Sequence, residues 1–175
     1  MENLKQIISE KAIKQRVEEI AKEISATFEG EVPILVSVLN GSFIFASDLL
    51  RALKVDCEID FIKVSTYSGN KSKGTIDFQK DISAEISNRH VIIVEDIIDS
   101  GLTVKFIRER FINFEPKSIT IATLLMKPDV AKIDFEVNWV GFEIPPDYVV
   151  GYGLDYNQKF RNLRGIYILG GNNYE

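Results

Sequence analysis

The residues best suited to chemistry lie between positions 91 and 103, which read VIIVEDIIDSGLT. The β-branched run at 91 to 94 is typical of a strand buried on both faces, so the chain after it should emerge at the carboxyl end of a parallel sheet, where open α/β folds bind ligands. There Glu95 and Asp96 would accept hydrogen bonds from two adjacent hydroxyl groups. Beyond them, hydroxyl donors, a glycine and the start of a helix suit a phosphate dianion; these residues are Ser100, Gly101 and Thr103. The spacing therefore predicts a cradle for a sugar phosphate.

A purely structural explanation of this segment is a capped turn, with Asp99 or Ser100 as N-cap and Gly101 easing the backbone. Two acids directly after four buried residues are costly in such a turn, because carboxylates near a sheet must be paired or solvated. A ligand or a metal ion removes that cost, which favours a binding site.

The remaining hydrophobic pattern supplies the elements that would position these residues. Apolar residues at helical spacing predict an amphipathic helix over residues 3 to 26. Strands are expected at 34 to 39, 58 to 64, 91 to 94, 118 to 125, 139 to 142 and 149 to 152, with helices at 42 to 53 and 103 to 111. This alternation indicates an α/β fold with a mostly parallel sheet.

Composition excludes several classes of protein. The chain has 175 residues, which fits one domain, and its 45% apolar and 27% charged content is ordinary for a globular protein. A net charge of −5 argues against nucleic-acid or anionic-membrane binding. With one cysteine and one histidine, Cys57 and His90, a disulfide, a cysteine-histidine zinc site and a histidine triad are not expected. Cys57 is expected in the core and His90 exposed at a strand start. Without a long apolar stretch or a signal-like N-terminus, cytoplasm is the expected location.

Four further segments contain residues that could take part in binding or catalysis, and each also has an ordinary structural explanation. The stretch between Val64 and Asp77 is rich in glycine, serine and lysine and predicts a surface loop. The Asn-Gly-Ser turn at 40 to 42 is a second strand-to-helix junction, where amides can face an anion or simply cap a helix. Lys127 follows a strand and by itself would be a surface charge, and Tyr148 by itself would be a core aromatic.

Taken together, these segments resemble one family. EDIIDSGLT resembles the phosphoribosyl pyrophosphate (PRPP) loop of type I phosphoribosyltransferases, in the form found in the hypoxanthine-guanine branch. Further agreement in order and spacing comes from VLNGSFIF at 38 to 45, STY at 65 to 67, LLMK at 124 to 127 and DYVVGYGLDYNQKFRNL at 147 to 163. The resemblance covers roughly residues 32 to 165, and five motifs in the same order make it specific. The chain departs from the family where Ser100 replaces the usual Thr and where Asn40 replaces a common Lys.

The resemblance implies the type I phosphoribosyltransferase fold, a mostly parallel twisted sheet flanked by helices, with a small hood from the terminal segments. We expect a single domain over residues 1 to 175, the hood being built from the N-terminal helix and the segment after about 139. The family also implies a homodimer or homotetramer, with small-molecule substrates as partners.

The resemblance also assigns roles residue by residue. The PRPP loop would be Glu95, Asp96, Asp99, Ser100, Gly101, Leu102 and Thr103, and the pyrophosphate contacts would be Leu39, Asn40, Gly41 and Arg161. In the family a cis peptide often precedes the residue matching Asn40. Magnesium would be held by Asp155, with Glu95 and Asp96 in its shells. A loop at the position of Thr66 and Tyr67 closes over the site in the family.

For the base, the family assigns Lys127 to the 6-oxo group of a purine, Tyr148 to stacking and the backbone of Val149 to the ring edge. A cation accepts no hydrogen bond, so Lys127 should favour a carbonyl over the amino group of adenine. Asp99 would act as the catalytic residue at purine N7.

The expected reaction is therefore transfer of 5-phosphoribosyl from PRPP to hypoxanthine or guanine, giving IMP or GMP in purine salvage. Two rivals remain at this point. One is an enzyme of the same fold that accepts xanthine, adenine or a pyrimidine, and the other is a regulator that binds PRPP or a nucleotide without turnover. Lys127 and the apparently complete acidic set favour the 6-oxopurine enzyme, although fold alone does not decide.

Overall fold

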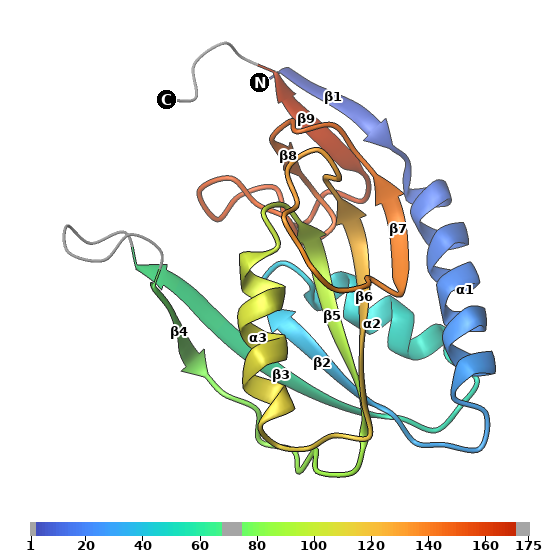
Figure 1. Cartoon of the computed structure of the whole chain (residues 1–175). Coiled ribbons are helices and arrows are strands. Elements are labelled where there is room, and N and C mark those ends of the chain that lie inside the picture. Colours follow the sequence, from blue (N-terminus) through green and yellow to red (C-terminus); the bar gives the residue numbers. More distant parts are fainter. Residues whose placement is uncertain (1–2, 68–74, 171–175) are drawn as a thin grey trace.

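The computed structural model describes residues 3–67 and 75–170 and contains two sheets (Figure 1). The larger sheet has six strands in the order β4-β3-β2-β5-β6-β7, all parallel except β4 against β3. Its strands are β2 (Ile34–Leu39), β3 (Glu58–Tyr67), β4 (Thr75–Lys80), β5 (His90–Ile98), β6 (Ser118–Met126) and β7 (Trp139–Glu143). The smaller sheet has the order β1-β9-β8, formed by β1 (Asn3–Ile8), β9 (Ile166–Gly170) and β8 (Val149–Val150). The expected α/β fold with a mostly parallel sheet is confirmed.

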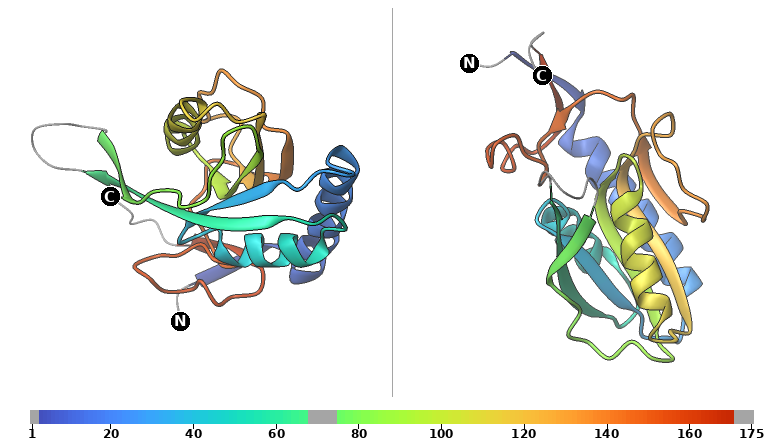
Figure 2. Two further views of the ribbon diagram at one scale, coloured as in Figure 1. Left: turned by 90° about the horizontal axis from the view of Figure 1, so that it is seen from below. Right: turned by 60° about the vertical axis from the view of Figure 1, so that its left-hand side comes forward.

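Helices cover both faces of the larger sheet (Figures 1 and 2). On one face lie α1 (Glu10–Thr27) and α2 (Phe43–Ala52), and α3 (Leu102–Ile112) lies on the other. The strands are buried on both sides: Leu35 and Ile92 belong to the core under α1 and α2, while Val36 and Ile93 belong to the core under α3. This two-sided burial explains why the strands are continuous apolar runs without alternation.

The helix expected over residues 3 to 26 is wrong at its start. Residues 3–8 form β1, which pairs antiparallel with β9, and the helix begins only at Glu10. Ser9 is the N-cap, and its hydroxyl accepts from the backbone N–H of Ala12 at 3.2 Å. The helical spacing of apolar residues runs through this boundary because both elements bury residues against the same core, so periodicity alone hid the break.

The hood also differs from the expectation. The smaller sheet lies beyond the carboxyl ends of the parallel strands and is built from β1, β8 and β9, whereas α1 packs on α2 and β7. The segment after 139 is divided, since β7 pairs with β6 in the larger sheet. The sequence pattern predicts no strand at 166–170. Strand β9 forms there because it pairs with β1 and β8.

Four strands, β3, β5, β6 and β7, run further than expected, and β8 ends earlier. The acids Glu95 and Asp96 lie inside β5, which continues to Ile98 beside β6. The strand β8 ends at Val150 because Gly151 and Tyr152 both have positive φ. His90 starts β5 as expected, but it is partly buried beside Phe28, with ring centroids 5.1 Å apart, and its Nδ1 lies 2.6 Å from Ser118 Oγ.

The surface loop expected between Val64 and Asp77 is mostly strand where it is described. The backbone of Thr66 pairs with Ile76, and that of Tyr67 pairs with Thr75. Residues 68–74 lie outside the described residues. The glycine- and lysine-rich composition concealed a hairpin whose far strand alternates apolar and polar side chains.

Candidate active site

Three strand-to-helix or strand-to-loop junctions meet at the carboxyl edge of the larger sheet. They follow β2 at residues 39–42, β5 at 95–103 and β6 at Lys127. Parallel neighbours finish at the same edge, so residues nearly ninety positions apart in sequence come together. A fourth segment, residues 151–163, joins them from the side of the hood.

Glu95 and Asp96 form the acidic floor of this edge. Glu95 is buried, and its Oε2 has no hydrogen-bond partner within the described part of the chain. Burial, together with the neighbouring Asp96 carboxylate, holds the pKa of Glu95 well above its usual range. Burial also raises the pKa of Asp96 to about 6, partly offset by the Ile97 backbone N–H. The groups around the two acids do not offset the cost of burying two negative charges, which suits hydroxyl donors or a cation from a ligand.

The turn after β2 lies directly against Asp96. The peptide bond between Leu39 and Asn40 is cis, as the resemblance implied. A Cβ atom on Gly41 would lie 1.5 Å from Asp96 Oδ2, so a side chain has no space there. Ser42 also holds the turn in place, because its buried hydroxyl donates to Val38 O at 2.6 Å. Gly41 thus allows the turn after β2 to approach the Asp96 side chain closely.

The segment after β5 leads into the amino end of α3. Gly101 has a φ of +83° and precedes the first helical residue, Leu102, which is exposed. Asp99 and Ser100 are exposed beside it, and Thr103 is half-buried in the first turn. Backbone N–H groups at a helix start, preceded by a glycine in the left-handed region, form the kind of site that binds phosphate.

Lys127 and Asp99 form an ion pair across the ends of β6 and β5. Lys127 Nζ donates to Asp99 Oδ2 at 2.8 Å, and the lysine is almost buried while the aspartate is half-exposed. The lysine backbone N–H is also held by Ile98 O at 2.9 Å. The family resemblance implies separate contacts of these two residues with the purine, and nothing in the sequence indicates that they touch each other.

The segment after β8 brings the remaining candidates together. Arg161 Nη2 lies 2.7 Å from Asp155 Oδ1, and Arg161 Nη1 donates to Gly153 O at 2.7 Å. Tyr148 is half-exposed, and its hydroxyl donates to Asp155 O at 2.9 Å. Val149 is buried in β8. The backbones of Thr66 and Tyr67 lie at the end of β3.

Whether this site can hold a divalent cation depends on the arrangement of its acidic side chains. Among residues 3–67 and 75–170, no group of three Asp, Glu, His or Cys side chains is arranged to hold a metal. Magnesium commonly binds through one or two carboxylates plus the phosphates and waters of its ligand. The unpartnered Glu95 oxygen and the raised pKa values of Glu95 and Asp96 fit a cation that arrives with a phosphorylated substrate.

Residues 3–157 match the family model of the phosphoribosyl transferase domain, so the chain belongs to the phosphoribosyltransferase family. The chain is 42% identical over 168 residues to the hypoxanthine-guanine phosphoribosyltransferase of Aquifex aeolicus, covering 95% of this chain and 94% of that one. It is 40% identical to the enzyme of the same name from Bacillus subtilis, covering 94% and 92%.

Solved structures agree in fold. A hypoxanthine-guanine phosphoribosyltransferase from Bacillus anthracis superposes with a TM-score of 0.91 at 43% identity, covering 96% of this chain and all of that one. The hypoxanthine phosphoribosyltransferase of Trypanosoma cruzi, solved with its product IMP, gives a TM-score of 0.90 at 35% identity, covering 99% and 97%. The fold of the type I phosphoribosyltransferases is confirmed for this chain.

Proposed function

We propose that this protein is a purine salvage enzyme that transfers a 5-phosphoribosyl group from PRPP to hypoxanthine or guanine, forming IMP or GMP and pyrophosphate. The observation that carries the proposal is the Lys127–Asp99 pair, which lies beside an acidic floor and a phosphate-binding helix start. A cation and a carboxylate side by side match one edge of a 6-oxopurine, where the oxygen acceptor at C6 lies next to the ring nitrogen N7.

The reaction is a substitution at the anomeric carbon of the ribose. The bond from this carbon to pyrophosphate breaks while the bond to purine N9 forms, so the protein must hold a highly charged leaving group and place the base. We assign the leaving group to Arg161 and the turn at Leu39, Asn40 and Gly41. We assign the 5′-phosphate to residues 100–103 and the ribose hydroxyls to Glu95 and Asp96.

The base is assigned to four residues. Tyr148 stacks on it, Lys127 donates to its 6-oxo group and the backbone of Val149 faces its opposite edge. Asp99 accepts the proton at N7, which increases the nucleophilicity of N9; positioned proton transfer of this kind contributes about 10²–10⁴-fold. In this assignment Lys127 also keeps the Asp99 carboxylate oriented, because the two already form an ion pair.

Magnesium completes the proposal, with Asp155 and the pair Glu95 and Asp96 as the residues that would hold it. When bound with PRPP it would supply positive charge that stabilises the leaving pyrophosphate. The donors in this edge are carboxylate oxygens, which magnesium prefers.

We also place the enzyme in the cytoplasm as a homodimer or homotetramer, which the family resemblance supports. Within the described ranges, no helix is long and apolar enough to cross a membrane. Light scattering of the purified protein measures the oligomeric state.

The deciding experiment is an assay of the purified protein with PRPP, magnesium and each of five bases: hypoxanthine, guanine, xanthine, adenine and uracil. We expect pyrophosphate release with hypoxanthine or guanine, loss of release in excess chelator, and a loss of kcat with PRPP affinity kept in Asp99→Asn. Binding of PRPP without turnover of any base would identify a regulator instead. Preference for adenine or uracil would move the protein to another enzyme of this fold.

A further inference from the structure

Gly153 has a conformation and surroundings that the assigned roles do not use. Its φ is +103°, a region that side-chain-bearing residues rarely adopt, and it precedes the loop that contains Asp155. Its backbone is held on both sides by Arg161, because Gly153 N donates to Arg161 O at 3.0 Å and Gly153 O accepts from Arg161 Nη1 at 2.7 Å. Gly153 is therefore the part of the backbone to which the arginine is tied.

Gly153 also lies against the turn after β2. A Cβ atom on Gly153 would be 2.1 Å from the carbonyl oxygen of Gly41, which is backbone and has no flexible end to move. Gly41 in turn allows no Cβ because of Asp96. Two glycines thus bring together three segments that are remote in sequence: the loop after β8, the turn after β2 and the end of β5. The contacts run from Arg161 to Gly153, then to Gly41 and then to Asp96.

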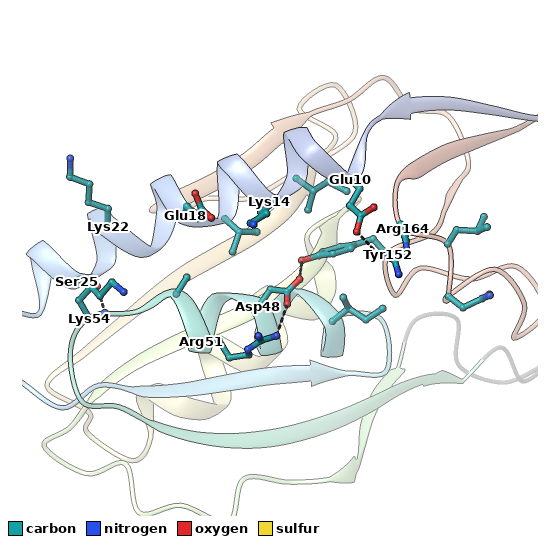
Figure 3. A pocket seen from close by; sticks show the side chains of 16 residues that line it. Glu10, Lys14, Glu18, Lys22, Ser25, Asp48, Arg51, Lys54, Tyr152 and Arg164 are labelled. Carbon is teal, nitrogen blue, oxygen red and sulfur yellow. Dashed lines mark hydrogen bonds and ion pairs between the residues drawn. The ribbon is translucent and has the colours of Figure 1, made fainter.

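The neighbouring residue, Tyr152, makes a second contact with the same region (Figure 3). Its hydroxyl donates to Asp48 Oδ2 at 2.7 Å, and Asp48 lies on α2, the helix that starts after the Gly41 turn. Tyr152 has a φ of +49°, which is uncommon for a tyrosine, and its backbone N–H is held by Leu163 O at 2.8 Å. Residues 152 and 153 therefore attach the Arg161 loop to the segment 41–48 at two points.

We propose that Gly153 is a positioning residue for the pyrophosphate half of the site, with the Tyr152 hydroxyl as its tether. Gly153 allows the Arg161 loop to lie in backbone contact with the Gly41 turn, so that the arginine and the turn face the same leaving group. Gly153 acts through Arg161 and Gly41 and needs no contact with substrate. The inference rests on the proposed function.

The test is Gly153→Ala, measured in both reaction directions. The added methyl group must push the loop away from Gly41, and misplacement by about 1 Å can cost as much as about 10²-fold. We expect KM for PRPP and for pyrophosphate in the reverse reaction to rise at least about tenfold. The affinity for IMP, which contains no pyrophosphate, should stay within about twofold of the unmodified protein. A merely structural defect would weaken all three.

Gly151→Ala is the matched control. Gly151 has the same φ of +103°, and a Cβ there would also lie 2.1 Å from a backbone carbonyl, but that carbonyl belongs to Gly165 on the side of the hood. Thermal unfolding should show comparable destabilisation of the two variants, with KM for PRPP and pyrophosphate near normal in Gly151→Ala. Equal effects of both variants on pyrophosphate would overturn the inference.

If Gly153→Ala does not fold, Tyr152→Phe tests the inference instead, because this substitution removes only the hydrogen bond to Asp48. Loss of one hydrogen bond worth about 1 kcal/mol predicts about a fivefold higher KM for PRPP and pyrophosphate with IMP affinity unchanged. Normal constants in this variant, or in a folded Gly153→Ala, would overturn the inference while leaving the proposed function intact. If the unmodified protein itself releases no pyrophosphate from PRPP with any base, the proposed function fails first.

Discussion

At the scale of single residues, the site is built from groups that the fold does not favour. Glu95 is buried with an unpartnered oxygen, and burial raises the pKa of Asp96 to about 6. At a position with only a structural role, neutral residues would be more stable than such buried acids. The proposed ligand, which would supply donors or positive charge, accounts for both acids, and their burial without it costs stability.

Asp96→Asn should make the protein more stable at pH 8 while abolishing the use of PRPP. The folded pKa of about 6 is higher than the usual 3.8, so the folded state binds the proton more tightly. This contribution to stability is complete below pH 3.8 and is lost as the pH rises through 6. Without magnesium or ligand, we expect the free energy of unfolding at pH 8 to rise on the order of 1–3 kcal/mol.

Urea unfolding at pH 8 and pH 5 measures this effect. The advantage of Asp96→Asn should shrink toward pH 5, because the wild-type carboxyl is then largely protonated in the folded state. An advantage that is absent at pH 8, or the same at both values, would contradict the assigned pKa.

Lys127→Gln should narrow the preference for hypoxanthine over adenine. An ammonium accepts no hydrogen bond, so the amino group of adenine faces it unpaired at a cost of about 1–3 kcal/mol, whereas glutamine offers both a donor and an acceptor. We expect kcat/KM for hypoxanthine to fall about 10- to 100-fold, so that the ratio of kcat/KM for hypoxanthine to kcat/KM for adenine becomes smaller. KM for PRPP should change little.

Lys105→Gln is the control, since Lys105 also pairs with an aspartate, Asp134, at 3.4 Å but on the exposed surface. Its kinetic constants should match those of the unmodified protein. Equal use of adenine and hypoxanthine by the unmodified protein would show that Lys127 does not distinguish the bases.

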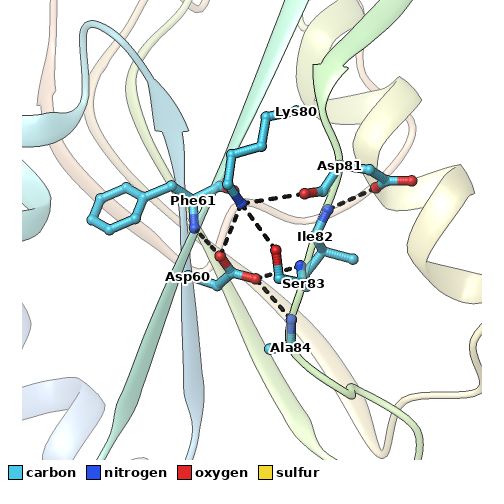
Figure 4. Close-up of polar contacts among 7 residues, drawn as sticks. All are labelled: Asp60, Phe61, Lys80, Asp81, Ile82, Ser83 and Ala84. Atoms are coloured by element: carbon cyan, nitrogen blue, oxygen red, sulfur yellow. Dashed lines mark hydrogen bonds and ion pairs between the residues drawn. The ribbon is translucent and has the colours of Figure 1, made fainter.

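At the scale of elements, one carboxylate joins the β3–β4 hairpin to the chain that follows it (Figure 4). Asp60 Oδ1 accepts from Phe61 N and from Lys80 Nζ, and Oδ2 accepts from the backbone N–H groups of Ser83 and Ala84 at 2.6 and 2.8 Å. Burial opposes ionisation of Asp60, but these donors together outweigh it and lower its pKa. The carboxylate fixes the end of the hairpin that lies away from the Tyr67–Thr75 pair.

Asp60→Asn should destabilise the protein by about 1–3 kcal/mol at pH 7, because an amide cannot accept from donors at both of its atoms. Since the folded pKa is lowered, the wild-type contribution is present above the usual pKa of 3.8 and is lost as the pH falls below it. Thermal unfolding at pH 7 and pH 3 should show a difference that is smaller at pH 3. The exposed Asp134→Asn serves as the control, and equal loss in both variants would contradict a special role for Asp60.

At the scale of the whole molecule, the hood and the larger sheet share one core. Ile8, Val149 and Ile166 of the hood belong to the same buried cluster as α1, α2 and one face of the large sheet. Burial that is continuous between the two sheets leaves no boundary at which they would separate. A single cooperative unit over the described residues is therefore the prediction for this chain.

Unfolding in urea should accordingly be one cooperative transition. Trp139, the only tryptophan, lies at the start of β7 with its ring centroid 6.3 Å from that of Phe28, so its fluorescence reports the packing of α1. Its transition should coincide with that of far-ultraviolet circular dichroism, which reports all elements. Two separated transitions would indicate that the hood unfolds independently.

Much of this protein could be read from its sequence because the relevant signals are local. Residues 34–39 are a buried strand by their apolar run, and the cluster EDIIDSGLT places acids, glycine and a helix start in one short segment, so their chemistry follows from order alone. The choice between a helix and a strand at residues 3–8 was not local, because it depends on β9, more than 150 residues away. Ser9 is the N-cap of α1 in the structure, but the helical spacing of apolar residues crosses this position and therefore does not mark the boundary.

The contacts between segments were decided only by the tertiary structure. Nothing in the order of residues indicates that Lys127 meets Asp99, or that Gly153 lies against Gly41 and Gly41 against Asp96. The physical reason is that parallel strands bring their carboxyl ends to one edge whatever the length of chain between them, and close packing there fixes which backbones touch. The sequence by itself determined the types of groups available for the reaction, and the packed sheet determined which of them act together.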